Sequence, residues 1–269
     1  SFNTGAQGNL PPNPSQIKMF PIRPVDYLWQ FMKELTVSAK MSPNGLKIVV
    51  IGGGAAGVEL ACNINHILQT YKNNPEVSLY TKGNRLLSQF SENISQKVYK
   101  YLLKQNINVF LNSDVVEIQK GQVFLSNNTT ANYDLGILAT GIQPNLIKSG
   151  GRLEMSSKGE FVINPYLQCK SHKTVFATGD CSYLESAPLW KSGYHAINQG
   201  PTLLHNIIAT SENTKLRPYR PTKRMITALN LGNGYGIVIY GSFSYLGKLA
   251  FSIKDRIERR YIKSHQCKE

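Results

Sequence analysis

Short apolar runs alternate along this chain with stretches in which apolar residues recur every three or four positions. Residues 48–51 are four consecutive β-branched residues, a pattern that favours a buried parallel strand over a helix. Residues 60–68 then place Leu, Ala and Ile on one helical face. Further strands are predicted at residues 77–80 and 107–111, and Ser91 is the predicted N-cap of the helix between them. This alternation predicts a parallel sheet covered by helices.

The periodicity changes after the third strand. Residues 115–119 and 122–125 alternate apolar and polar positions around Lys120-Gly121, which predicts a β-hairpin. Residues 135–139 return to an apolar run and predict a closing strand. Residues 46–145 are therefore expected to form a three-layer, Rossmann-like α/β domain with a hairpin insertion.

The regions on either side of this domain have other patterns. Five of the 13 prolines lie within residues 11–24, which predicts an extended connection, and an apolar stripe predicts a helix from Val25. Residues 225–229 and 236–240 are the predicted strands of a second hairpin, turned at Asn233-Gly234. A final helix is expected after this hairpin, with an apolar stripe that runs from Leu246 to Tyr261, so the C-terminal region is predicted to be α+β.

Composition excludes several classes of protein. The chain has 269 residues, enough for two domains, and 41% of them are hydrophobic, which suits a globular core. No apolar run approaches the roughly 18 residues that a membrane-spanning helix needs. The four cysteines are widely spaced and form no C-x-x-C pair, which argues against a disulfide framework, a redox dithiol or a metal site in this segment. A cytoplasmic protein is expected.

The net charge of +14 comes from 30 Lys and Arg against 16 Asp and Glu, so the surface attracts anions such as nucleotide phosphates and acidic lipids. No basic stretch is interleaved with aromatic residues, so no specific nucleic-acid partner is expected. The final helix carries several of these charges. Its stripe is expected to pack on the hairpin or across a homodimer, and peripheral binding to an anionic membrane is the alternative.

Candidate chemistry begins at the end of the first strand, where Gly52, Gly54 and Gly57 form a G-x-G-x-x-G fingerprint. Such glycines allow a tight turn, the approach of backbone to a pyrophosphate and close packing of helix on strand, while the helix N-terminus offers N–H donors. The alternative is a plain glycine-rich turn. Two more strand ends, Thr140-Gly141 and Gly179-Asp180, are expected at sheet edges where open α/β folds bind ligands.

The end of the second strand carries cations where NAD-specific folds place an acid. The sequence from Thr81 to Arg85 has no carboxylate that would bind the ribose 2′-hydroxyl. Lys82 and Arg85 are candidates for holding a 2′-phosphate, which favours NADPH over NADH. The alternative is that both are exposed loop cations.

The order of these strand ends resembles that of the pyridine nucleotide-disulfide oxidoreductase superfamily, flavoproteins with two dinucleotide-binding domains that include type II NADH dehydrogenases. The resemblance implies that hydride passes from NAD(P)H to FAD and then to a small-molecule acceptor. It also implies that Glu59 contacts the nicotinamide, that Asp180 binds the FAD ribityl chain, and that backbone near Gln199 stabilises the reduced flavin. The candidate cofactor-binding residues are Gly5, Gly52, Gly54, Ala55, Ala56, Gly57, Glu59, Thr81, Lys82, Arg85, Thr140, Gly141, Gly179, Asp180, Lys191 and Gln199.

The same resemblance implies how the chain is divided. Residues 1–24 are expected to be a remnant of the first FAD-domain segment with a linker, and residues 25–45 a connecting helix. Residues 46–145 are the NAD(P)H-binding domain, inserted in this partial FAD domain, and residues 146–210 the second FAD-domain segment. The hairpin and helix of residues 211–269 are expected to form an interface region.

The C-terminal half of the chain resembles one branch of this superfamily and departs from the type II NADH dehydrogenases. Residues 190–201 and the tail of residues 218–257 are similar to a flavoprotein branch that is often fused to, or encoded near, selenophosphate synthetase, which is therefore a candidate partner. Type II NADH dehydrogenases carry an Ala-Gln-x-x-x-Gln pattern that falls here on Gly193, Tyr194 and Asn198, so quinone is disfavoured as the acceptor. The family's first FAD fingerprint is expected upstream of Ser1, so this segment alone is expected to bind FAD weakly and to be inactive.

No side chain is predicted to act as a catalytic acid or base, because no Ser-His-Asp set or pair of carboxylates suggests itself. His195 is expected to be structural, with a proton relay as the alternative. We therefore expect an FAD-dependent NAD(P)H oxidoreductase. The alternatives are a nucleotide-binding regulatory partner in selenium metabolism and a peripheral-membrane NADH:quinone reductase.

Overall fold

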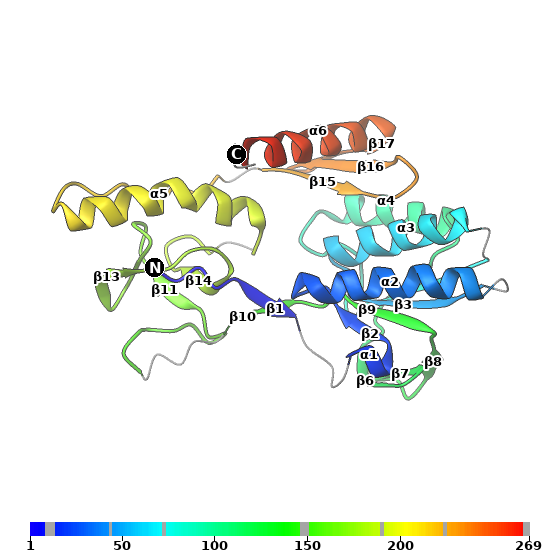
Figure 1. The fold of residues 1–269 in the computed structure, drawn as a ribbon. Helices are drawn as coiled ribbons and strands as arrows, with labels where there is room; N and C mark the ends of the chain where they lie inside the picture. Colours follow the sequence, from blue (N-terminus) through cyan, green and yellow to red (C-terminus); the bar gives the residue numbers. More distant parts are fainter. Residues whose placement is uncertain are drawn as a thin grey trace. The chain divides into compact units, whose positions relative to one another are not determined.

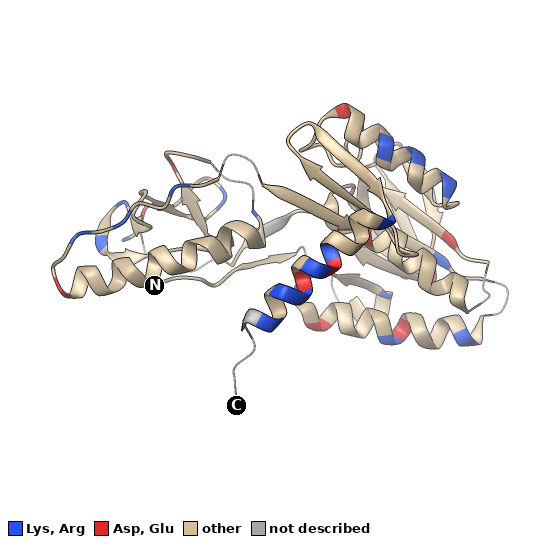
Figure 2. Ribbon diagram, turned by 90° about the horizontal axis from the view of Figure 1, so that it is seen from above, with Lys and Arg blue, Asp and Glu red and all other residues tan. Residues whose placement is uncertain are grey.

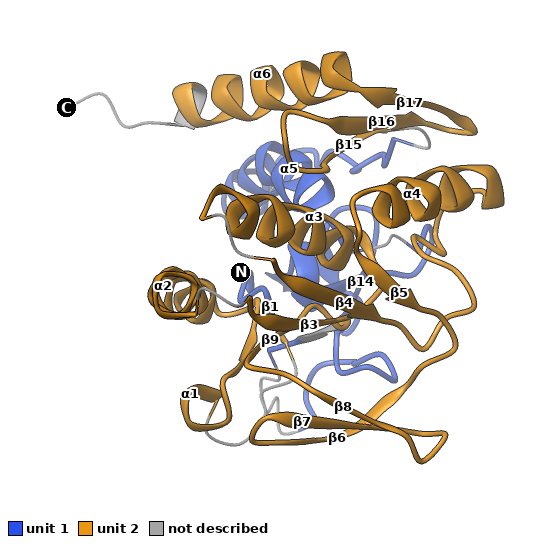
Figure 3. Cartoon of the chain, turned by 90° about the vertical axis from the view of Figure 1, so that its right-hand side faces the viewer, with its two compact units in different colours: residues 1–7, 142–223 blue, residues 8–141, 224–269 orange. Residues whose placement is uncertain are grey.

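The structure is a computed structural model that describes residues 1–8, 14–42, 45–71, 74–145, 151–188, 191–222 and 225–265. Its elements are shown in Figure 1. The chain divides into two compact units, a larger one of residues 8–141 and 224–269 and a smaller one of residues 1–7 and 142–223 (Figure 3). Among the described helices, none combines the length and the apolar character needed to cross a membrane.

A five-stranded parallel sheet lies at the centre of the larger unit. Alternate residues of its middle strand pack on opposite sides: Ile48 and Val50 join the core beneath the helices, whereas Val49 and Ile51 join a second core on the other face. Burial on both faces explains the unbroken β-branched run. The strands are, in sheet order, β2 (Met19–Pro21), β9 (Leu135–Leu138), β3 (Lys47–Ile51), β4 (Glu76–Tyr80) and β5 (Asn108–Phe110).

Two further layers complete this Rossmann-like domain. The helical layer comprises α2 (Val25–Met41), α3 (Ala55–Thr70) and α4 (Glu92–Lys104), whose buried residues share one core with the sheet. On the other face lies the antiparallel sheet of β6 (Val115–Gln119), β7 (Gln122–Leu125) and β8 (Thr130–Asn132). The predicted α/β class with a hairpin insertion is confirmed, and β8 adds a strand that was not predicted. Ser91 stands at the N-cap of α4, although its side chain accepts no capping hydrogen bond.

The C-terminal region adds an antiparallel sheet and a helix to the larger unit. The sheet lies between α6 and the helices α3 and α4 in both Figure 1 and Figure 3. Its inner face contributes Leu229, Ile237 and Ile239 to the main core. The elements are β15 (Ile226–Asn230), β16 (Gly236–Tyr240), β17 (Phe243–Gly247) and α6 (Lys248–His265).

One expectation for this region was wrong, and the packing of the final helix on the hairpin is only partial. Residues 243–247 form a strand, β17, that pairs along its whole length with β16, although Leu246 was assigned to the stripe of the final helix. The hairpin also leaves most of that stripe uncovered: Ala250 is fully buried, but Leu249 and Ile257 are 61% and 50% exposed. The helix backbone approaches the sheet closely at Gly236, where a Cβ would lie 2.8 Å from the backbone nitrogen of Phe251.

The smaller unit is built around a four-stranded sheet in the order β13 (His172–Phe176), β12 (Gln168–Cys169), β11 (Phe161–Ile163) and β14 (Ser182–Leu184). Near the N-terminus, Phe2 stacks on Phe161 with ring centroids 4.5 Å apart. Its backbone pairs in parallel with Ala177, beyond the end of β13. The remaining elements are β1 (Ala6–Gly8), which pairs with β10 (Ile142–Pro144), the 3-10 turn η1 (Gly179–Cys181) and α5 (Gly193–Ser211).

The compact units differ from the predicted ranges at three places. The proline-rich segment is not only an extended connection, because it contains α1 (Pro14–Ile17) and β2, and β2 pairs with β9. Residues 8–24 therefore belong to the larger unit. Residues 142–145 and 211–223 belong to the smaller unit. Within that unit, α5 begins at Gly193, after Ser192 as its N-cap.

Candidate functional site

The loop between β3 and α3 requires glycine at two of its three fingerprint positions. Gly52 has a φ of 127°, and a Cβ there would lie 2.4 Å from the carbonyl oxygen of Ala139. A Cβ on Gly57 would lie 1.8 Å from the carbonyl oxygen of Gly52. Gly52 therefore makes the turn, and Gly57 lets α3 pack closely on the end of β3.

Gly54 is not required by any such contact. It has a φ of −78° at the N-cap of α3, and a Cβ there would meet no atom within 4 Å. Ala55 and Ala56 form the first turn, so no side chain accepts a hydrogen bond from the first N–H groups of the helix. A pyrophosphate fits this arrangement, because the space beside Gly54 is open and the helix N-terminus presents donors.

Two other predicted residues lie beside this loop. Thr81, which follows β4, is buried against it, since a Cβ on Gly53 would lie 2.7 Å from the Thr81 hydroxyl. Thr140 follows β9, and its backbone nitrogen would lie 3.0 Å from a Cβ on Gly52. Gly141, next along, is exposed. The sheet thus brings three strand ends together at one edge.

The two predicted loop cations have partners within the protein. The Lys82 ammonium lies 3.0 Å from a carboxylate oxygen of Asp114, and the lysine side chain is 81% exposed. The Arg85 guanidinium donates to the carbonyl oxygens of Ser88 and Phe90 at 2.8 and 2.9 Å. Arg85 therefore stabilises its own loop, and Asp114 places an acid near the end of β4 that was not predicted. The NADPH preference stays a prediction.

Glu59 lies one turn into α3, and its contacts come from the C-terminal region. Its Oε1 atom accepts a hydrogen bond from the Asn230 backbone N–H at 2.7 Å and lies 3.2 Å from the Lys254 ammonium. Burial raises the pKa of Glu59, an effect that Lys254 and the Asn230 N–H oppose. Neither partner was predicted, because both lie far away in the sequence. The nicotinamide contact of Glu59 stays a prediction.

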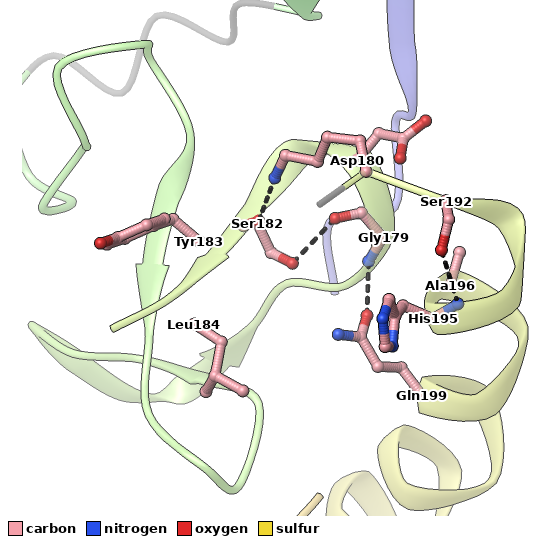
Figure 4. Close-up of a pocket in the computed structure, with 10 residues that line it drawn as sticks. Gly179, Asp180, Ser182, Tyr183, Leu184, Ser192, His195, Ala196 and Gln199 are labelled. Carbon is pink, nitrogen blue, oxygen red and sulfur yellow. Dashed lines mark hydrogen bonds between the residues drawn. The ribbon is translucent and has the colours of Figure 1, made fainter. Parts of the chain in front are cut away.

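The second group of predicted residues lies in the smaller unit, around the turn that follows β13. Gly179 has a φ of 69°, and its N–H donates to Oε1 of the buried Gln199 side chain at 2.7 Å. Figure 4 shows Gln199 projecting from α5 toward this turn, with the Asp180 carboxylate on its opposite side. A shallow pocket lies here, lined by Gly179, Asp180, Ser182, Lys191, His195 and Gln199.

Gly5 lies in the N-terminal segment of the same unit. Its carbonyl oxygen accepts from the Asn145 N–H at 3.3 Å, and the Asn145 amide donates to the Thr4 carbonyl oxygen at 2.6 Å. The segment continues from Phe2, whose carbonyl oxygen accepts from the Thr178 N–H at 3.0 Å. The structure therefore brings the N-terminal segment beside the strand end that carries Asp180.

Lys191 is held by a buried acid that was not predicted. Its ammonium lies 2.7 Å from Oε1 of Glu160, a side chain only 6% exposed, and donates to the Ser182 carbonyl oxygen at 2.6 Å. The other Glu160 oxygen accepts from the Ser156 hydroxyl at 2.7 Å. Lys191 therefore connects the segment before α5 to the sheet. Trp190, which belongs to the motif of residues 190–201, lies outside the described residues.

His195 is buried on the same face of α5, one turn before Gln199. Its Nδ1 lies 3.1 Å from the hydroxyl of Tyr219, which is also buried. Burial lowers the pKa of His195, so the neutral imidazole is favoured. This geometry supports the structural role.

The buried His195 predicts that stability depends on pH. Because its folded-state pKa lies below the ordinary value of about 6.5, its contribution is complete above that value and is lost as pH falls through the folded-state pKa. We expect the melting temperature to fall by a few degrees between about pH 7 and pH 5. The H195Q variant should show a flatter pH profile. The H205Q variant, changed on the same helix at a less buried histidine, should keep the wild-type profile, and equal profiles for all three proteins would contradict this role.

Comparison with known proteins places these observations in context. The model of the pyridine nucleotide-disulphide oxidoreductase family matches residues 3–200. Ferroptosis suppressor protein 1 of Taeniopygia guttata is 27% identical over 218 residues, which cover 77% of this chain and 56% of the relative. The type II NADH:quinone oxidoreductase of Haemophilus influenzae is 28% identical over 190 residues, which cover 66% of this chain and 43% of that enzyme. The chain thus spans about half the length of these curated relatives.

The fold recurs in solved structures. The structure of NDH2 from Plasmodium falciparum in complex with NADH matches with a TM-score of 0.73 and 16% identity, covering 98% of this chain and 73% of that protein. At this identity the likeness concerns the fold. It agrees with the Rossmann-like sheet of the larger unit.

Proposed function

Because the chain belongs to the pyridine nucleotide-disulphide oxidoreductase family, we propose that its larger unit binds NAD(P)H and that the nucleotide reduces FAD in the complete protein. The observation that carries this proposal is the open space at Gly54. Gly52 and Gly57 are explained by contacts within the protein, whereas a glycine at position 54 is explained by a pyrophosphate at the N-terminus of α3.

The residues around both strand-end groups have binding roles in this proposal. The N–H groups at the start of α3 hold the pyrophosphate, and Thr140 and Gly141 border the nucleotide. In the smaller unit, Asp180 binds the ribityl chain, and Gln199 holds the turn that presents it. FAD supplies the electron-accepting chemistry when bound, and the protein supplies orientation and charge.

The acceptor is proposed to be a small molecule. One relative is by name an NADH:quinone oxidoreductase, which makes quinone a candidate. Gly193, Tyr194 and Asn198 depart from the quinone-side pattern expected of such enzymes, so we favour another acceptor. The selenophosphate synthetase partner stays a prediction.

Anaerobic reduction tests the proposal. The complete protein, purified with its flavin, is mixed with NADH or NADPH without oxygen, and the flavin absorbance is followed. Bleaching by either nucleotide is the expected result. A yellow protein that neither nucleotide bleaches would contradict the oxidoreductase and favour the regulatory, nucleotide-binding alternative.

Asp114 is predicted to lower the affinity for NADPH. Its carboxylate neutralises the Lys82 ammonium, so D114N should leave this cation available to a 2′-phosphate. We expect NADPH to bind about threefold to fivefold more tightly to D114N, as for an exposed ion pair, with NADH unchanged. Titration of both nucleotides measures the effect. The control is D255N, which removes the same charge from α6, and an equal gain for NADH would contradict the assignment.

The exposed face of α6 favours a second property, peripheral binding to an anionic membrane. Leu249, Ile253 and Ile257, spaced four residues apart on one face, are 61%, 37% and 50% exposed, and Phe243 of the adjoining sheet is 67% exposed. Lys and Arg residues follow this helix along its length (Figure 2). An anionic surface attracts such a helix, whereas two basic copies repel each other, so we favour the membrane over a homodimer.

Vesicle sedimentation tests this property. The complete protein is expected to sediment with vesicles that contain phosphatidylglycerol at low salt, and to be released at high salt. Neutral phosphatidylcholine vesicles are the control. If the protein sediments with neither vesicle type and elutes as a dimer in gel filtration, the exposed face of α6 is a homodimer interface and the membrane proposal is wrong.

A further inference from the structure

The Glu59 carboxylate is where three elements of the larger unit meet. Glu59 belongs to α3, the helix that begins at the glycine fingerprint. The Asn230 N–H, at the end of β15, and the Lys254 ammonium, from α6, contact the same carboxylate oxygen at 2.7 and 3.2 Å. The fingerprint helix is therefore joined to the C-terminal sheet and helix through one acidic side chain.

Lys254 is placed to hold this junction. Its side chain is only 16% exposed, although most cations of α6 face solvent. Besides Glu59, it contacts Glu258 at 2.7 Å and donates to the Ala228 carbonyl oxygen at 3.3 Å. Burial lowers the pKa of Lys254, but the two carboxylates more than offset this effect, so the net direction is upward and the charged form is favoured.

The same junction is packed tightly on α3. The Asn63 amide, one turn beyond Glu59, donates to the carbonyl oxygens of Glu59 and Asn230 at 2.7 and 3.2 Å. A Cβ on Gly232 would lie 2.7 Å from the carbonyl oxygen of Cys62. Because backbone and side chains interlock here, a shift of α6 or of the turn after β15 displaces α3.

We propose that Lys254 is a positioning residue for the NAD(P)H site: by holding Glu59, it couples the docking of α6 to the alignment of the fingerprint helix. The inference rests on the proposed function, since it concerns the nucleotide bound at the N-terminus of α3. It assigns α6 a role in nucleotide affinity, in addition to the membrane binding proposed for the exposed face of this helix. By linkage, a bound nucleotide then stabilises the docked position of α6.

Nucleotide titration of variants of the complete protein tests the coupling. The K254M variant is expected to bind NADH or NADPH about fivefold to tenfold more weakly, and K254R to retain most of the affinity. The matched control is R259M, because Arg259 pairs with Asp255 on the same helix but is 78% exposed. R259M should bind like the wild type.

A double variant separates positioning from folding. If Lys254 acts through Glu59, adding K254M to E59Q should weaken nucleotide binding no further. The double variant should fold, because the carboxylate that it leaves without a lysine partner belongs to Glu258, which is 57% exposed. Hydrogen exchange supplies a second measurement: saturating nucleotide should slow exchange in residues 248–258 of the wild type but not of K254M. A structural role alone would not produce this difference.

The outcomes distinguish the two proposals. Wild-type protein that binds neither nucleotide would overturn the proposed function and, with it, this inference. Wild-type protein that binds nucleotide, together with K254M of unchanged affinity and unchanged exchange in α6, would overturn the role of Lys254 alone. A lower melting temperature of K254M with wild-type affinity would also overturn it.

Discussion

Alanine at position 54 is expected to reduce NAD(P)H affinity at least about hundredfold, or about 2.8 kcal/mol, while the protein stays folded. The backbone at Gly54 has a φ of −78°, which alanine adopts readily, and a Cβ there meets no atom within 4 Å. The added methyl group therefore costs the fold less than about 1 kcal/mol. It fills the space in front of the α3 N-terminus, which a pyrophosphate would need.

Alanine at Gly57 is the matched control, because it makes the same chemical change three residues later. There the Cβ would lie 1.8 Å from the Gly52 carbonyl oxygen, so the helix must move away from the strand. We expect G57A to lower the free energy of unfolding by several kcal/mol, as severe overpacking does.

Thermal unfolding and isothermal titration of the complete protein separate the two variants. G54A should melt close to the wild type while binding nucleotide at least about hundredfold more weakly, and G57A should melt at a much lower temperature. If G54A binds NADH and NADPH with wild-type affinity, the fingerprint is only a tight turn, which is the alternative that the sequence left open.

Much of the larger unit was predictable because its signals are local. Residues 48–51 are apolar at every position, since both faces of β3 are buried, and the helices that follow show their own periodicity. β2 was missed because it has three residues, one of them proline, and pairs with β9 more than a hundred residues away. Glycine at position 136 leaves room for the Met19 side chain in this pairing, because a Cβ there would overlap the end of that side chain. No pattern within residues 11–24 indicates the pairing.

The candidate site was predictable to a similar extent. The three glycines predicted the tight turn and the close helix packing after β3. Asp114, Asn230, Lys254 and Glu160 were missed because each meets its partner through the tertiary fold. One feature of the smaller unit's site was visible in the sequence. His195 and Gln199 are four residues apart, which places two polar side chains on one helical face, and both are buried in the structure.

Methionine at Lys191 is expected to lower the free energy of unfolding by about 3 kcal/mol, which is typical when one partner of a buried ion pair is removed. Glu160 is 6% exposed, and among the described residues its carboxylate keeps the Ser156 hydroxyl as its one side-chain partner once the ammonium is gone. K170M is the control, because Lys170 pairs with Glu154 and Glu185 at the surface and is 48% exposed. Its melting temperature should stay close to that of the wild type.

The double variant E160Q/K191M decides whether Lys191 binds FAD or only holds the turn before α5. Removing both charges leaves no uncompensated carboxylate, so most of the lost stability should return. FAD retained per protein, measured after gel filtration of the complete protein, is the second readout. If Lys191 contacts the cofactor, FAD should still be lost from the stable double variant. If FAD returns together with stability, Lys191 is a structural link between α5 and the sheet, and the prediction that it binds FAD is wrong.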